Sequence, residues 1–113
     1  MTNIIHPTAI IMEGSILGKN NNIGPFSVIG SKVVLGNGNI LKSHVVLDGN
    51  TVIGNNNQFF PFASIGSVTQ DKKYQGEDSQ LIIGNNNVFR EYTTANPGTF
   101  KDDTTKIGND CLL

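Results

Sequence analysis

The sequence predicts an all-β fold, a parallel β-helix in which the chain winds around a triangular prism in coils of 18 residues. Two observations come from composition. The chain has 13 Ile, 8 Val and 9 Thr against 3 Ala and 3 Glu, and β-branched side chains favour strands over helices. Its 15 Asn and 13 Gly tolerate positive φ, which many tight corners require. The third observation is a repeat.

A large apolar residue recurs at every sixth position from Ile5 to Ile65. The residue four places after each is small, β-branched or Asn, as at Ala9, Ser27 and Asn57. Neither a helix nor an alternating strand has a period of six, and a conventional β-sandwich does not explain it. A short strand followed by a corner explains the period of six, because each unit then directs one large and one small side chain inward.

Three such units close one coil, and successive coils stack at the strand spacing of about 4.8 Å. The predicted coils are residues 5–22, 23–40 and 41–58, and a fourth begins at Phe59. The chain of 113 residues is therefore expected to form one domain, 1–113.

The rhythm is interrupted twice. It stops after Ile65 and resumes in the same six-residue phase at Ile83, which predicts a loop excursion over about 67–82. A second interruption spans 100–106, where Lys101 occupies an inward position. Long loops on a rigid scaffold commonly carry function, although solvated surface loops can have the same composition.

Composition and charge exclude several classes of protein. The net charge is −1 and 15% of the residues are charged, so no basic surface for nucleic acid is expected. No apolar run is long enough to span a bilayer, and no signal peptide is evident, so we expect no membrane insertion. The single cysteine, Cys111, forms no intrachain disulfide, which suits a soluble cytoplasmic protein.

The other chemically distinctive residues have structural interpretations. His6 and His44 have no metal-ligand companions at familiar spacing, and His44 is expected to point outward. The runs 20–22, 55–57 and 85–87 of Asn are interpreted as corner formers and possible stacked side-chain ladders. Cys111 falls in the small-residue slot and is expected to pack rather than react. No metal site or cofactor is expected.

The six-residue period resembles the hexapeptide-repeat family, whose members form left-handed parallel β-helices. More specifically, the chain resembles the acyl-carrier-protein–UDP-N-acetylglucosamine 3-O-acyltransferases of lipid A synthesis. The resemblance is carried, in order along the chain, by His6-Pro7-Thr8-Ala9-Ile10, Ile23-Gly24-Pro25-Phe26, Leu41-Lys42-Ser43-His44-Val45-Val46, Phe62-Ala63-Ser64-Ile65-Gly66, Gln70-Asp71, Lys73-Tyr74 and Gly76-Glu77.

The resemblance implies a homotrimer with sites between subunits, and transfer of an acyl group from acyl carrier protein to the 3-hydroxyl of UDP-N-acetylglucosamine. In that reaction a His serves as general base and a backbone N–H stabilises the oxyanion. Gln70, Asp71 and Lys73 match the family residues that hold the nucleotide sugar, with the Asp near the sugar hydroxyls.

Two departures from the family bear on activity. Neither His6 nor His44 matches the family's catalytic His, so no catalytic residue is assigned. Asn96 and Pro97 stand where the family commonly has His or Asn followed by Arg. The expectation is an N-terminal part, without the later coils and helical domain, that is inactive alone. A non-catalytic trimeric module, half of a split protein, and another nucleotide-sugar acyltransferase remain alternatives.

Apolar residues at outward phases of the repeat support the homotrimer. Phe26, Phe60, Phe62 and Val46 all fall at such phases, and large exposed apolar side chains commonly mark an interface. A monomer whose outward aromatic residues are scattered on the surface is the alternative.

Overall fold

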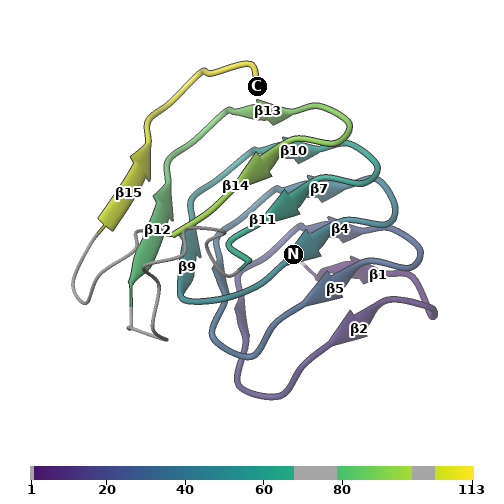
Figure 1. Ribbon diagram of the computed structural model, residues 1–113. Coiled ribbons are helices and arrows are strands. Elements are labelled where there is room, and N and C mark those ends of the chain that lie inside the picture. Colours follow the sequence, from purple (N-terminus) through teal and green to yellow (C-terminus); the bar gives the residue numbers. More distant parts are fainter. Residues whose placement is uncertain (1, 68–78, 98–103) are drawn as a thin grey trace.

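The chain forms a left-handed parallel β-helix with three flat faces of five strands each (Figure 1). The structure is a computed structural model, and it describes residues 2–67, 79–97 and 104–113. Face A contains β1 (Ile4–Ile5), β4 (Asn22–Ile23), β7 (Ile40–Leu41), β10 (Gln58–Phe59) and β13 (Val88–Phe89). Face B contains β2 (Ile10–Ile11), β5 (Val28–Ile29), β8 (Val46–Leu47), β11 (Ser64–Ile65) and β14 (Thr94–Ala95). Face C contains β3 (Ile16–Leu17), β6 (Val34–Leu35), β9 (Thr51–Ile53), β12 (Gln80–Ile83) and β15 (Thr104–Ile107).

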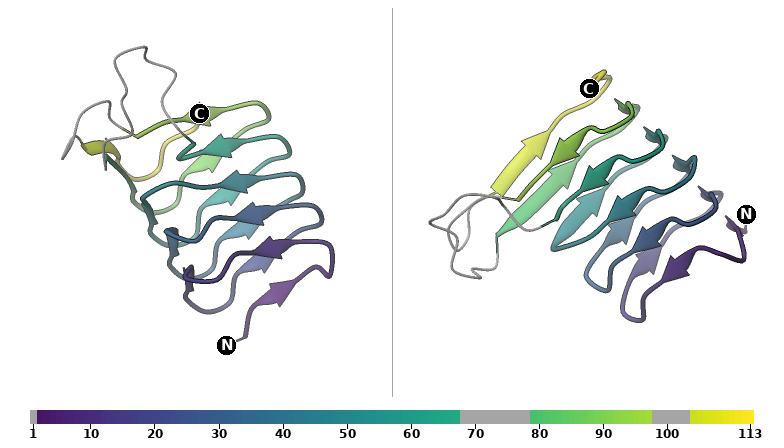
Figure 2. Two further views of the ribbon diagram at one scale, coloured as in Figure 1. Left: turned by 60° about the horizontal axis from the view of Figure 1, so that its bottom comes forward. Right: turned by 45° about the vertical axis from the view of Figure 1, so that its right-hand side comes forward.

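The register confirms the predicted coil of 18 residues. Ile5 pairs with Ile23, and Ile11 pairs with Ile29, on adjacent parallel strands. The coils stack along one axis, with the two termini at opposite ends of the prism (Figure 2). The described residues include no helix long and apolar enough to cross a membrane.

Face C shows how the two interruptions are accommodated. Ile83 pairs with Ile53, thirty residues earlier rather than eighteen, so twelve extra residues are inserted in that coil. Ile107 pairs with Ile83 at a separation of twenty-four, so the second insertion is six residues. Although Ile83 follows Ile65 by eighteen positions, it is Ala95 that lies above Ile65.

The C-terminal boundary of the predicted excursion, at about residue 82, lies inside a strand of the β-helix. Residues 80–82 belong to β12, because Leu81 pairs with Thr51 and is fully buried in the core.

The core is the stack of inward side chains that the six-residue period predicted. Every inward residue from Ile23 to Ile65 is at most 1% exposed, and Leu81, Ile83 and Phe89 continue these rows above the first insertion. Phe59 and Phe89 stack in parallel with their ring centroids 4.8 Å apart. In the first coil Ile5 is 42% exposed, because no coil covers it from below.

Backbone hydrogen bonds join each coil to the next along the axis. On the faces, N–H groups donate to carbonyls of the following coil, as from Ile10 to Ser27 at 2.8 Å. At the corners some bonds run the opposite way, as from the His44 N–H to the Pro25 carbonyl at 3.0 Å.

The corner between faces C and A, which we call the C–A corner, confirms the prediction of stacked Asn ladders. In the inner ladder, Oδ1 of Asn39 accepts from the backbone N–H of Asn57 at 2.9 Å, and Nδ2 of Asn39 donates to the Gly54 carbonyl at 2.9 Å. In the outer ladder, Oδ1 of Asn55 accepts from the N–H of Asn37 at 2.8 Å. The turn residue of this corner has positive φ in each coil: Asn20, Gly38, Asn56, Asn86 and Asp110.

Candidate functional site

The outer surface of face B changes from apolar to polar at the coil where the predicted excursion begins. Successive strand residues point to opposite sides of a sheet, so the residue before each inward one forms an outer row. On face B this row reads Ile10, Val28, Val46, Ser64 and Thr94 in axial order. We call Ser64, Ser67 and Thr94 the polar patch; the hydroxyls of its two serines are 3.0 Å apart.

The corner between faces B and C, the B–C corner, holds both ends of the predicted excursion, since β11 lies on face B and β12 on face C. Gly66 has φ of +83°, and a Cβ there would overlap the Asp48 carbonyl oxygen and the Thr51 hydroxyl of the coil below. Glycine is therefore required for the close approach of the two coils at this corner. Ser79 is 4% exposed, and its hydroxyl is the only buried side-chain oxygen or nitrogen without a hydrogen-bond partner in the described part of the chain.

The predicted nucleotide-sugar residues Gln70, Asp71 and Lys73 lie outside the described residues. Asn96 is half-buried and Pro97 is buried, directly after β14. The Gly66 N–H donates to the Ala95 carbonyl at 2.6 Å, so residue 96 follows one coil above the start of the excursion.

The two histidines lie on a different edge, the corner between faces A and B, which we call the A–B corner. Nδ1 of His6 is 2.8 Å from the Thr8 hydroxyl. His44 is exposed, as predicted, and stacks between the rings of Phe26 and Phe62 at centroid distances of 5.1 and 5.0 Å. The polar patch therefore includes neither histidine, and within the described ranges no three His, Cys, Asp or Glu side chains form a group suited to a metal ion.

The rings at the A–B corner form a continuous column that we call the aromatic ridge: Phe26, His44, Phe62 and Tyr92. Tyr92 completes it, with its ring 5.5 Å from that of Phe62. From the sequence, only Phe26 and Phe62 of this column were predicted to point outward, because His44 is not a hydrophobic residue and the twelve-residue insertion hides the alignment of Tyr92. A search for aromatic residues at the same corner position in every coil would have found all four.

The other two apolar residues that the repeat predicts to point outward, Val46 and Phe60, are half-buried rather than exposed. Val46 lies in the outer row of face B between Val28 and Ser64. Phe60 lies between two cations, with Lys42 Nζ 4.9 Å and Arg90 Cζ 4.1 Å from its ring centroid. Such contacts stabilise the corner through cation–π attraction.

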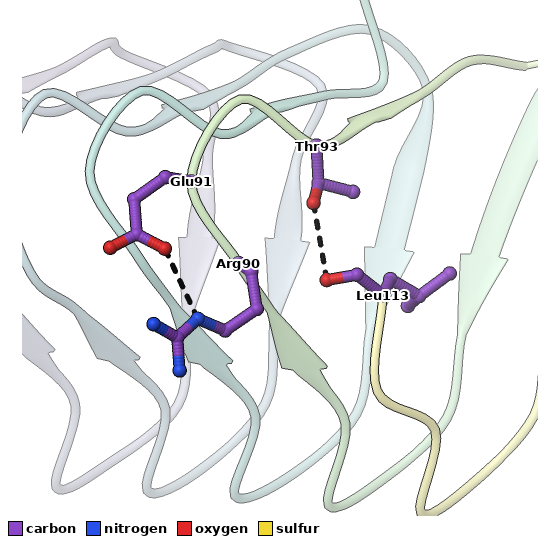
Figure 3. Close-up of polar contacts among 4 residues, drawn as sticks. All are labelled: Arg90, Glu91, Thr93 and Leu113. Atoms are coloured by element: carbon purple, nitrogen blue, oxygen red, sulfur yellow. Dashed lines mark hydrogen bonds and ion pairs between the residues drawn. The ribbon is translucent and has the colours of Figure 1, made fainter.

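The uppermost described turn of the A–B corner is fixed by polar contacts (Figure 3). Nε of Arg90 donates to Oε1 of Glu91 at 3.1 Å, and the Thr93 hydroxyl donates to the Leu113 carbonyl at 3.3 Å. A backbone hydrogen bond at Glu91, together with the bond from Arg90, lowers the pKa of the exposed Glu91 carboxyl.

Cys111 lies above Asn87 in the inner Asn ladder of the C–A corner. Its backbone N–H donates to Oδ1 of Asn87 at 2.8 Å, and the residue is only partly buried.

Comparison with known proteins identifies the scaffold. Residues 14–49 match the family described as bacterial transferase hexapeptide (six repeats). The UDP-N-acetylglucosamine O-acyltransferase from Moraxella catarrhalis superposes with a TM-score of 0.93 at 44% identity, over 96% of this chain and 43% of that one. The UDP-N-acetylglucosamine acyltransferase from Bacteroides fragilis superposes with a TM-score of 0.92 at 41% identity, over 97% of this chain and 43% of that one. The acyltransferase from Francisella novicida superposes with a TM-score of 0.92 at 43% identity, over 97% of this chain and 41% of that one.

The chain therefore spans about two fifths of the length of these relatives. Within that span the likeness covers nearly all of this chain. In sequence and in fold, the chain belongs to the UDP-N-acetylglucosamine O-acyltransferase family of hexapeptide-repeat proteins.

Proposed function

We propose that the chain supplies the nucleotide-sugar-binding part of an enzyme that transfers a 3-hydroxyacyl group from acyl carrier protein to the 3-hydroxyl of UDP-N-acetylglucosamine, the first step of lipid A synthesis. The observation that carries this proposal is the 44% identity over 96% of the chain to an enzyme named for that substrate. The appearance of hydroxyl groups on face B beside the predicted excursion supports the location.

The proposed roles follow from the chemistry of the side chains. A carboxylate such as that of Asp71 accepts hydrogen bonds from sugar hydroxyls, and the ammonium group of Lys73 pairs with a phosphate. Gln70 adds an amide that can both donate and accept. No cofactor or metal ion takes part in this proposal.

We further propose that the chain is inactive by itself. Acyl transfer to a hydroxyl requires a base within hydrogen-bond reach of the proton that it removes. His6 and His44 lie at the A–B corner, on the opposite edge of face B from the B–C corner, where β11 ends and β12 begins. The protein mixed with acyl carrier protein loaded with a 3-hydroxyacyl group and UDP-N-acetylglucosamine should give no turnover above background; clear turnover would disprove the inactivity.

Calorimetric titration with UDP-N-acetylglucosamine tests the binding role. We expect Asp71→Asn and Lys73→Ala each to weaken binding by about tenfold or more, since each removes a charge-assisted contact. Lys32→Ala, an exposed charge on the lower part of the B–C corner, is the matched control and should bind like the wild type. Stronger binding of a dTDP-amino sugar would favour another nucleotide-sugar acyltransferase, and no binding of either ligand would favour a non-catalytic module.

We infer a homotrimer in the cytoplasm. The trimer is supported by the exposed rings of Phe26, Phe62 and Tyr92, and the location by the single cysteine of the chain. Size-exclusion chromatography coupled to light scattering should give three times the chain mass of 12.1 kDa, whereas a monomer at micromolar concentration would end this proposal.

A further inference from the structure

We propose that three His44 side chains, one from each copy of the homotrimer, bind one divalent transition-metal ion on the threefold axis. The site rests on the homotrimer proposed above and adds a ligand that neither the acyl transfer nor the nucleotide-sugar site uses. It is supported by the orientation of the His44 ring, by the hydrogen bonding of the two histidines, and by the apolar rings on both sides of His44.

The imidazole ring of His44 lies across the prism axis. Its centroid is 5.1 Å from that of Phe26 in the coil below and 5.0 Å from that of Phe62 in the coil above, with interplanar angles of 32° and 27°. The coils stack along one axis (Figure 2), so rings that stack on one another present their edges to the side of the prism. Nε2 is at the end of an imidazole away from the backbone, so on the exposed His44 it is directed outward from the A–B corner.

The backbone holds the ring in this orientation. The N–H of His44 donates to the Pro25 carbonyl at 3.0 Å, and the His44 carbonyl accepts from the N–H of Phe62 at 3.1 Å. The φ of His44 is 51°, in the left-handed region that His adopts more readily than most residues other than glycine. A ligand whose position is fixed in this way before the ion arrives favours metal binding.

The two histidines of the sequence differ in their hydrogen bonds. Nδ1 of His6 lies 2.8 Å from the Thr8 hydroxyl and accepts from the Thr8 N–H at 3.2 Å. Neither ring nitrogen of His44 has a hydrogen-bond partner among the described residues, where the contacts of the ring are those with Phe26 and Phe62. A lone pair of His44 can therefore bind a ligand from outside the chain.

The threefold symmetry of the proposed trimer supplies the other two ligands. Phe26 and Phe62, whose 57% and 50% exposure supports the trimer, flank His44 at the same corner. Equivalent residues of three parallel copies lie at the same height, so the three His44 rings form one layer between a layer of Phe26 rings and a layer of Phe62 rings. The described part of a single copy holds no group of three metal ligands, and the companions of His44 come from the other two copies.

The chemistry of this layer favours a transition metal. Phenylalanine rings above and below keep water away from the imidazoles, and a buried polar group without a partner is costly. One ion shared by three nitrogens satisfies all three imidazoles together. Zn²⁺ accepts three imidazole nitrogens with water in the fourth position. The other rings of the ridge, Phe26, Phe62 and Tyr92, bring no carboxylate, and Mg²⁺ and Ca²⁺ prefer oxygen ligands.

Calorimetric titration of the untagged protein with zinc chloride tests the site through its stoichiometry, which should be one ion for every three chains. His44→Phe keeps an aromatic ring in the column, between phenylalanines that already have positive φ. We expect this variant to remain trimeric by light scattering and to lose the zinc binding. The controls His6→Asn and Cys111→Ser remove the other imidazole and the thiol, and each should still bind one ion for every three chains.

A trimeric wild type that binds no zinc, a stoichiometry of one ion per chain, or full binding by His44→Phe would each overturn the metal site and leave the trimer intact. A monomeric wild type would overturn both. None of these results alters the titration with UDP-N-acetylglucosamine, which tests the proposed function separately. If His44→Phe does not assemble, His44→Asn removes the imidazole with a residue that tolerates positive φ, and zinc binding that persists in this variant would overturn the proposal.

Discussion

The asparagines of the C–A corner show how one residue type serves two purposes at neighbouring positions. Asn39 is fully buried, and its side-chain amide satisfies backbone groups of the coil above. Asn37, two residues earlier, makes the equivalent kind of ladder contact at the surface, where it accepts from the Lys19 N–H at 2.8 Å. A buried backbone group that loses its partner is far more costly than an exposed one, because water replaces the partner only at the surface.

Replacing Asn39 should therefore destabilise the protein more than replacing Asn37. We expect Asn39→Ala to lower the free energy of unfolding by roughly 1–3 kcal/mol for each buried group left without a partner. Asn37→Ala should lower it by about 1 kcal/mol at most. Urea denaturation followed by circular dichroism measures both, and equal losses would contradict the importance of the buried ladder.

At the scale of the elements, the strands are only two to four residues long, and the corners decide where they stack. Gly24 lies at the A–B corner, where a Cβ would overlap the backbone carbonyl oxygens of Lys42 and Leu41 in the coil above. Gly108 lies at the C–A corner of the last described coil, where a Cβ would meet no atom within 4 Å. The two glycines thus share a position after an inward residue but differ in what lies above them.

This difference predicts opposite outcomes for the same substitution. Gly24→Ala forces two backbones apart and should lower the free energy of unfolding by roughly 1–3 kcal/mol. Gly108→Ala should leave it unchanged or raise it by about 0.4–1 kcal/mol, because alanine restricts the unfolded chain. Thermal unfolding of the two variants beside the wild type would show the contrast, and a similar loss in both would refute it.

For the whole molecule, the period of six was enough to predict the coil length, the inward rows and the Asn ladders. It was not enough to assign faces beyond Ile65, because an insertion of six or twelve residues preserves the six-residue phase while changing the face. The stacking of Ile83 on Ile53 depends on contacts between coils that no local pattern records. The position of the site was predicted only through Gln70, Asp71 and Lys73, and the aromatic ridge was missed in part because Tyr92 follows the longer coil.

The dependence of stability on neighbouring coils predicts which deletions the molecule tolerates. Removing residues 23–40 joins Asn22 to Leu41 and places Leu41 above Ile5 in the same inner row. We expect this variant to keep its β circular dichroism and a cooperative thermal transition, since each coil contacts only its neighbours. Removing 23–37 instead shifts every later inward residue by three positions and should abolish the transition; a folded product would contradict the model of stacked coils.

The bonds along the prism axis also determine how the protein would respond to mechanical force. Tension between the two ends would load the backbone hydrogen bonds that join one coil to the next, so the coils would detach one after another. An ordinary coil of 18 residues would release roughly 60 Å of extended chain. The coil between Ile53 and Ile83 would release thirty residues, roughly 100 Å. Stretched from its ends, the molecule would lengthen in nearly equal steps, and the longest step would mark the coil that carries the predicted sugar-binding residues.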